Sequence, residues 1–197
     1  GKFNLYGGTI TNNTADYGGG VLVGSGTTFN MYGGSITNNT ADGDEGYGGG
    51  GVCVKGGTFN MHGGTIAANK ATIYTGKGNG GGVSVVDGGR FTMNGGTIGG
   101  TRDYNQATGN GGGVYVSGER STFTMNGSAS VAYNKAISGT GSYTSDGGNG
   151  GGVYVKGTGV SVSNNGTFTM NKNASVTGNT AKNGGGAYVK SGKFEMN

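Results

Sequence analysis

Acidic side chains are the first candidates for chemistry in this chain, because glycosidases and many lyases depend on paired carboxylates. The 197 residues contain only nine Asp and Glu and one histidine, His62. Three acids stand isolated and six fall between apolar segments: Asp87, Glu119 and Glu195, then Asp16, Asp42, Asp44, Glu45, Asp103 and Asp146. No acid recurs at the outward positions of the apolar segments, and His62 has no base or nucleophile partner in the pattern. We therefore expect no catalytic residues and no enzyme.

Metal and cofactor chemistry is also weakly represented. The run Asp42-Gly43-Asp44-Glu45 brings oxygen ligands together as a Ca²⁺ site requires, but it lacks the spacing of an EF-hand loop. Cys53 is the only cysteine, so no internal disulfide can form. The sequence thus predicts no metal and no cofactor.

Asparagine is the polar residue with the most regular spacing. Six asparagines each stand two residues before an alanine: Asn13, Asn39, Asn69, Asn105, Asn134 and Asn179. They could form a ladder of ligand groups, or a structural ladder in which each amide bonds its neighbours above and below and tolerates left-handed backbone. We favour the structural ladder, because a binding site seldom needs six copies in single file.

Tyrosines occupy a second recurring position, between two inward-facing apolar residues. The residue at this position is, from coil to coil, Leu22, Cys53, Ser84, Tyr115, Tyr154 and Tyr188. Because it should point outward, Tyr115, Tyr154 and Tyr188 are expected to form an exposed aromatic stripe that packs on sugar rings or on a partner. We favour the alternative to ligand binding, which is cross-strand pairing of the tyrosines that rigidifies a sheet or lies beneath a loop.

These regular positions arise because one apolar motif, Phe-x-Met or once Phe-x-Leu, recurs along the whole chain. Its phenylalanines are Phe3, Phe29, Phe59, Phe91, Phe123, Phe168 and Phe194. A constant apolar unit with spacers of variable length indicates a solenoid, in which each repeat stacks on its neighbours. The same register argues against the disorder that 52 glycines would otherwise suggest.

Each repeat contains three short segments with period-two apolar patterning, such as residues 21–23, 29–31 and 35–37. Glycine clusters separate the segments and supply tight corners. We therefore predict a right-handed, single-stranded parallel β-helix of about six coils with three short strands per coil. The Phe, Met, Val and Ile side chains should lie inside it.

The net charge of the chain excludes few classes of binding partner. The net charge is +4, and the basic residues are scattered singly, without the clustering and interleaved aromatics of a nucleic-acid surface. The modest excess suits acidic glycans or anionic surfaces, or is solvated decoration. No apolar run is long enough to span a bilayer. We expect neither nucleic-acid binding nor direct membrane insertion.

The repeat also resembles a known group of proteins. Gly-Gly-Gly-Val at residues 111–114 and 150–153, with Phe-Thr-Met-Asn at 91–94, 123–126 and 168–171, is similar to the paired motifs of chlamydial polymorphic outer-membrane proteins and to right-handed β-helix repeats of bacterial surface proteins. The resemblance implies an extracellular, cell-surface segment acting in adhesion or self-association, with a host or bacterial surface glycan or protein as partner.

Two alternatives to an adhesive segment stay open. One is a carbohydrate-binding or polysaccharide-active β-helix. The other is a self-assembling filament subunit, because the chain opens on Gly-Lys-Phe-Asn-Leu and stops on Gly-Lys-Phe-Glu-Met-Asn, the same phase of the coil. We expect residues 1–197 to be one β-helix segment of a longer surface protein, and head-to-tail stacking is the alternative.

Overall fold

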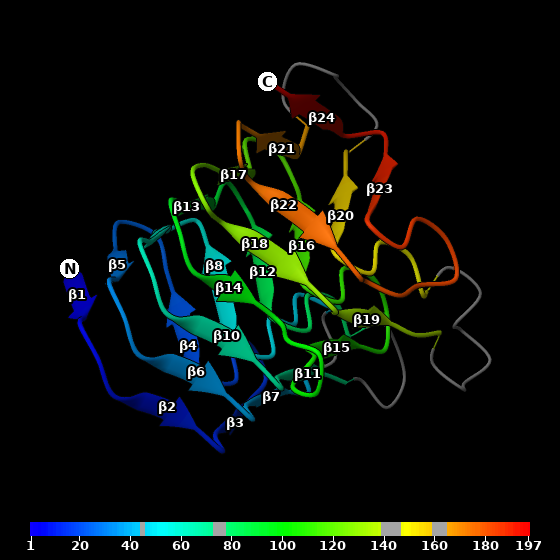
Figure 1. The fold of residues 1–197 in the computed structure, drawn as a ribbon. Coiled ribbons are helices and arrows are strands. Elements are labelled where there is room, and N and C mark those ends of the chain that lie inside the picture. Colours follow the sequence, from blue (N-terminus) through cyan, green and yellow to red (C-terminus); the bar gives the residue numbers. More distant parts are fainter. Residues whose placement is uncertain (44–45, 73–77, 139–146, 159–164) are drawn as a thin grey trace.

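The apolar segments identified in the repeat form strands in the computed structural model, which describes residues 1–43, 46–72, 78–138, 147–158 and 165–197. Every named strand pairs in parallel with the strand one coil away, so that Phe29 lies between Phe3 and Phe59. The result is a parallel β-solenoid, which runs from β1 at one end to β24 at the other (Figure 1). The fold class is as expected, and the right-handed sense of the coil stays a prediction.

The solenoid has four faces, which we name after the residue that each one turns inward. The Phe sheet contains β1 (Lys2–Leu5), β5 (Thr28–Met31), β9 (Thr58–Met61), β13 (Arg90–Met93), β17 (Thr122–Met125), β21 (Thr167–Met170) and β24 (Lys193–Met196). The Ile sheet contains β2 (Thr9–Thr11), β6 (Ser35–Thr37), β10 (Thr65–Ala67), β14 (Thr97–Ile98), β18 (Ser130–Ala132) and β22 (Ser175–Thr177).

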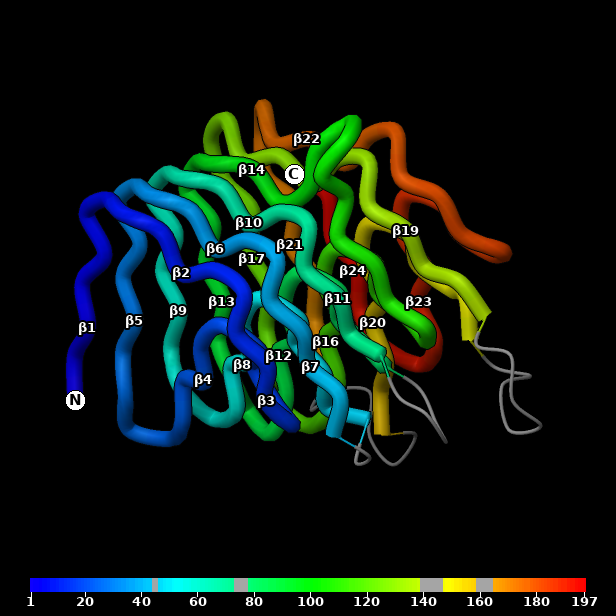
Figure 2. The backbone as a smooth tube through the Cα atoms, turned by 90° about the horizontal axis from the view of Figure 1, so that it is seen from below, coloured from blue at the N-terminus to red at the C-terminus, as the bar shows by residue number. Residues whose placement is uncertain are grey.

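The other two faces are the Ala sheet and the Val sheet. The Ala sheet contains β3 (Thr14–Ala15), β7 (Thr40–Ala41), β11 (Lys70–Ala71), β15 (Gln106–Ala107) and β19 (Lys135–Ala136). The Val sheet contains β4 (Val21–Val23), β8 (Val52–Lys55), β12 (Val83–Val86), β16 (Val114–Ser117), β20 (Val153–Lys156) and β23 (Ala187–Lys190). Figure 2 shows the corresponding strands of successive coils side by side.

The Ala sheet corrects the prediction of three strands per coil, because most coils have four. Its strands are only two residues long, and two residues cannot display a period-two pattern. The backbone defines them instead, through the parallel pairing of Ala41 with Ala15 and with Ala71. The alanines are buried in every strand of this sheet after the first, where Ala15 is exposed, so this short face closes the coil around the core.

The predicted ladders fill the interior. Phe59, Phe91, Phe123 and Phe168 are fully buried, and so are Met61, Met93, Met125, Ile66 and Ile98. Neighbouring rings stack, with centroids 4.7 Å apart between Phe59 and Phe91 and 4.8 Å apart between Phe91 and Phe123. The interior placement of the Phe, Met, Val and Ile ladders is therefore confirmed in the central coils.

The last glycine before each Val-sheet strand permits this close packing. A Cβ on Gly51 would lie 2.9 Å from the oxygen of Gly82 and 3.0 Å from both Asn69 Nδ2 and Ile66 Cγ2. Since any larger side chain must displace backbone or core atoms there, the position requires glycine. Gly186 occupies this column in the last coil, where Ala187 begins the strand and pairs with Val153.

Candidate functional site

The six predicted asparagines form one hydrogen-bonded column at the corner between the Ile and Ala sheets. Asn39, Asn69, Asn105 and Asn134 are completely buried. Asn39 donates from its backbone nitrogen and from Nδ2 to Asn69 Oδ1, at 2.9 and 3.1 Å, and Asn69 repeats both bonds to Asn105 at 3.0 Å. Asn13 and Asn134 bond Asn39 and Asn179 in the same way. The amides thus join coil to coil.

The left-handed backbone lies one residue earlier than expected. Positive φ angles occur at Asn12, Asn38, Ala68 and Tyr133, each directly before a ladder asparagine, with Gly178 in the same place in the last complete coil. The ladder asparagines themselves are not among the positive-φ residues that the structure describes. Their role is therefore hydrogen bonding, while the sharp turn of the backbone belongs to the preceding residue.

Three further amide ladders were not identified from the sequence. They connect Asn4, Asn30 and Asn60; then Asn94, Asn126, Asn171 and Asn197; then Asn79, Asn110, Asn149 and Asn183. In each of them Nδ2 donates toward the N-terminal coil, opposite to the first ladder. The last set carried a readable signal, because each member directly precedes three glycines.

These directions give the two ends of the solenoid complementary polar groups. At the N-terminal end, among the described residues, no hydrogen bond reaches Asn13 Oδ1, and Asn4 Nδ2 donates none. At the C-terminal end the backbone N–H of Asn179 is the next donor in the column of Asn13, whereas the column of Asn4 ends at Glu195. The acceptor of one end therefore matches the donor of the other.

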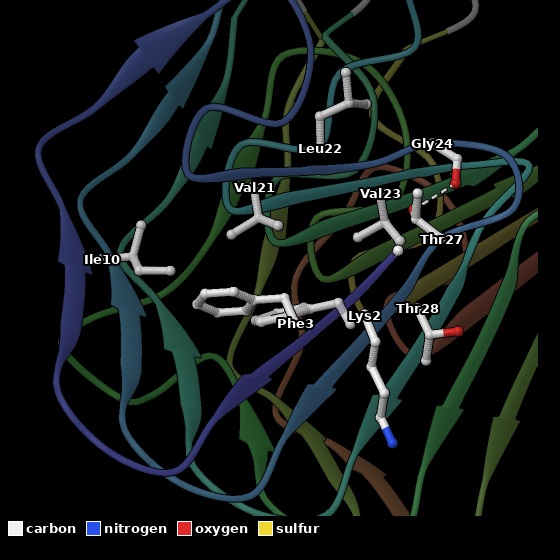
Figure 3. A pocket seen from close by; sticks show the side chains of 11 residues that line it. Lys2, Phe3, Ile10, Val21, Leu22, Val23, Gly24, Thr27 and Thr28 are labelled. Atoms are coloured by element: carbon white, nitrogen blue, oxygen red, sulfur yellow. Dashed lines mark hydrogen bonds between the residues drawn. The ribbon is translucent and has the colours of Figure 1, made fainter.

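The N-terminal end is also an apolar cavity, seen from close by in Figure 3. Phe3, Ile10, Val21 and Val23 surround it, and its volume is about 410 Å³. Phe29 of the next coil also lines it, with its ring centroid 5.3 Å from that of Phe3. Phe3 is 55% exposed, whereas its counterpart Phe59 is fully buried. This cavity is the cross-section of the core, and it has the shape that another coil would cover.

The structure corrects the expected exposure of the three tyrosines. Tyr115 and Tyr154 are buried, at 7% and 4% exposure, and Tyr188 is half-buried, so the expected exposed aromatic stripe is wrong. Their rings stack on one another with centroids 5.5 Å apart in both pairs. They belong to a second apolar cluster outside the Val sheet, together with Cys53 and Val86.

Residues from the spacer segments cover this second cluster. Tyr17 and Tyr47, which precede β4 and β8, pack against it, and Lys55 Nζ lies 5.4 and 4.7 Å from their ring centroids. Burial raises the pKa of the Cys53 thiol to about 12, and it also raises the pKa of Tyr115. The arrangement corresponds to the alternative of paired tyrosines beneath a loop. The sequence missed Tyr17 and Tyr47 because they lie in spacers of unequal length.

Exposed aromatic rings lie on a different corner. Tyr6 and Tyr32 stack at 4.9 Å, and Tyr32 stacks on His62 at 4.8 Å. Both faces of the Tyr32 ring are therefore occupied by its neighbours. Around His62 and elsewhere, no group of three or more His, Cys, Asp or Glu in the described residues could hold a metal ion. Asp44 and Glu45 of the Ca²⁺ candidate lie outside the described residues.

Comparisons with known proteins identify no relative from which a function could be assigned. No family model matches the chain, and neither a curated protein nor a solved structure does. The resemblance to bacterial surface β-helix repeats accordingly stays a prediction. Among the described residues no helix is long and apolar enough to cross a membrane.

Proposed function

We propose that this chain is a structural and adhesive segment of a bacterial surface protein, a solenoid displayed outside the cell that mediates attachment or self-association. The observation that carries the proposal is the complementarity of the two end coils. One end presents the apolar cavity around Phe3 with Asn13 Oδ1 as an acceptor, and the other presents Phe194 with the donors of Asn179. A coil of the same design extends the rod from either end.

The unequal number of strands in the sheets determines how two copies of the chain could stack end to end. The Phe sheet has seven strands, while the Ile and Val sheets have six each. A second copy in register would place its β1 where β24 already lies, and these strands read Lys-Phe-Asn-Leu and Lys-Phe-Glu-Met. We infer that β24 of one copy takes the place of β1 in the next copy. Such a contact is heterologous and generates open filaments.

The test is the association state of the 197-residue chain as concentration rises. Sedimentation should show a concentration-dependent series of oligomers, and electron microscopy should show unbranched rods. Phe194→Lys should abolish the series, because Phe194 takes the place of Phe3 in this joint, and it lies half-buried in the last strand of the chain. Tyr104→Lys, at an exposed position outside the end coils, is the control and should leave association unchanged. Monomers at every concentration would contradict self-association.

A polysaccharide-active β-helix is the competing function, because many such enzymes share a parallel coil. Incubation with pectin, alginate and glycosaminoglycans, followed by assay of unsaturated or reducing ends, separates the two. We expect no turnover. Clear turnover would replace the structural proposal by an enzymatic one.

A further inference from the structure

The basic residues are scattered in the sequence, yet the fold gathers more than half of them along one corner, where the Val sheet turns into the Phe sheet. Lys55, Lys156 and Lys190 end strands of the Val sheet. Lys2, Arg90 and Lys193 begin strands of the Phe sheet, and Arg120 stands in the turn between β16 and β17. All of them are exposed except Lys55, which is half-buried. Figure 2 shows this turn at the lower edge, between β4 and β5.

The charge of this corner accounts for the net charge of the whole chain. It holds seven of the 13 basic residues and three of the nine acids, Asp87, Glu119 and Glu195, which gives 7 − 3 = +4. The remaining six basic and six acidic residues cancel, since the total is also +4. Because neighbouring coils are ~4.8 Å apart, the five coils from Lys55 to Lys190 carry the charge along roughly 20 Å of the rod.

A groove lies within this charged corner. Asp87, Arg90, Glu119, Arg120 and Thr158 line it together with two glycines, and its volume is about 780 Å³. Asp87 and Arg120 both have left-handed backbone, with φ of 53° and 60°. Ser121 Oγ accepts from the Gly88 nitrogen at 3.1 Å and donates to the Ser117 carbonyl at 2.7 Å, so the two neighbouring turns are tied together. The groove walls are therefore held by the fold.

We propose that this corner groove binds an extended acidic polysaccharide, a chain of sugars that carries carboxylate or sulfate groups. Arginine pairs with such groups through two parallel hydrogen bonds, which Arg90 and Arg120 can supply. Asp87 and Glu119 accept hydrogen bonds from sugar hydroxyls. A ligand with both anions and hydroxyls fits a groove with both signs of charge, and the row of lysines extends the attraction to neighbouring sugars.

A nucleic acid fits the same groove poorly. Single strands are held by aromatic rings on which bases stack, and the residues that line this groove include none. Asp87 and Glu119 would also repel a phosphate backbone of dense negative charge. The inference rests on the proposed attachment function and gives it a ligand class.

The test is calorimetric titration of the folded 197-residue chain with oligogalacturonate and with heparin, with neutral dextran and single-stranded DNA as comparisons. Both acidic polysaccharides should bind, with affinity that falls as salt rises, and dextran should not. The double variant Arg90→Gln/Arg120→Gln should weaken binding by about tenfold or more. The control Arg102→Gln/Lys172→Gln removes the same charge elsewhere on the exposed surface and should change affinity by less than about twofold.

A second double variant separates recognition from simple attraction. Asp87→Asn/Glu119→Gln makes the corner more positive, so attraction alone predicts tighter binding of oligogalacturonate. Hydroxyl recognition predicts weaker binding of oligogalacturonate and tighter binding of DNA. Equal losses in the arginine and control variants, no binding at low salt, or tighter binding of DNA than of polysaccharide by the native chain would overturn the inference. Sedimentation of the same samples keeps the outcomes distinct, because loss of polysaccharide binding with unchanged association leaves the proposed self-association standing.

Discussion

Asn39 and Asn69 are 30 residues apart in the chain, yet Asn69 Oδ1 accepts hydrogen bonds from both the backbone nitrogen and Nδ2 of Asn39. Asn69 Nδ2 in turn donates to the Ile36 carbonyl at 2.9 Å and to Asn105 Oδ1 at 3.0 Å. One side chain therefore satisfies buried groups of two neighbouring coils. This relationship makes the ladder a test of how the coils are held together.

Asn69→Ala should destabilise the protein by about 3 kcal/mol or more, because several buried polar groups lose their partners at ~1–3 kcal/mol each. Asn13→Ala, at the exposed end of the same ladder, should cost less than about 1 kcal/mol. Urea unfolding followed by circular dichroism measures both. Equal losses for the two variants would contradict the structural role of the buried amides.

Phe91→Ala should lower the free energy of unfolding by about 3–5 kcal/mol, because its fully buried ring stacks on Phe59 and Phe123. Phe3→Ala removes the same side chain from the open end and should cost under about 1 kcal/mol. Thermal and denaturant unfolding provide the comparison. A small effect at Phe91 would mean that the Phe ladder is not the core.

Ala68→Gly should stabilise the protein by about 1 kcal/mol, because Ala68 has a φ of 56° and only glycine adopts this conformation without steric cost. Ala67→Gly is the matched control. Ala67 is a buried residue of β10 in extended backbone, so the same substitution there should destabilise by about 1 kcal/mol. Opposite signs at adjacent positions are the expected result, and equal signs would refute the strain at Ala68.

Alkaline pH should weaken the second cluster. Burial raises the pKa of Cys53 from 9.0 to about 12, so the folded state keeps a proton that the unfolded state loses above pH 9. The contribution of Cys53 is therefore fully present below pH 9 and falls by about 1.4 kcal/mol per unit between pH 9 and 12. Unfolding experiments at pH 7.5, 9 and 10.5 should show a shallower decline for Cys53→Ala. Rapid alkylation of native Cys53 at pH 8 would argue against its burial.

The repeat determined the parallel coil and most of its interior from sequence alone. Phe-x-Met, Val-x-Val and the isoleucine or valine before each ladder asparagine recur in one register, and period-two patterning places such residues on one face of a strand. The ladder at Asn39 and Asn69 was also predictable, because its spacing to the next alanine is constant in every coil. Local spacing is sufficient wherever the residue and its neighbours belong to a segment that recurs with constant length in every coil.

The tertiary structure decided what covers the outside of that coil. Tyr115 and Tyr154 point away from the core as their strand pattern predicts, but they are buried in a second cluster. Tyr17 and Tyr47 pack against that cluster from spacers of variable length, and no local period encodes that contact. The corner that collects Arg90 and Arg120 is hidden in the sequence for the same reason, since residues about thirty positions apart become neighbours only when the coils stack. The apolar period of a strand determines which way a side chain points. Its burial, and the charge of the surface around it, depend on distant segments that the coil brings together.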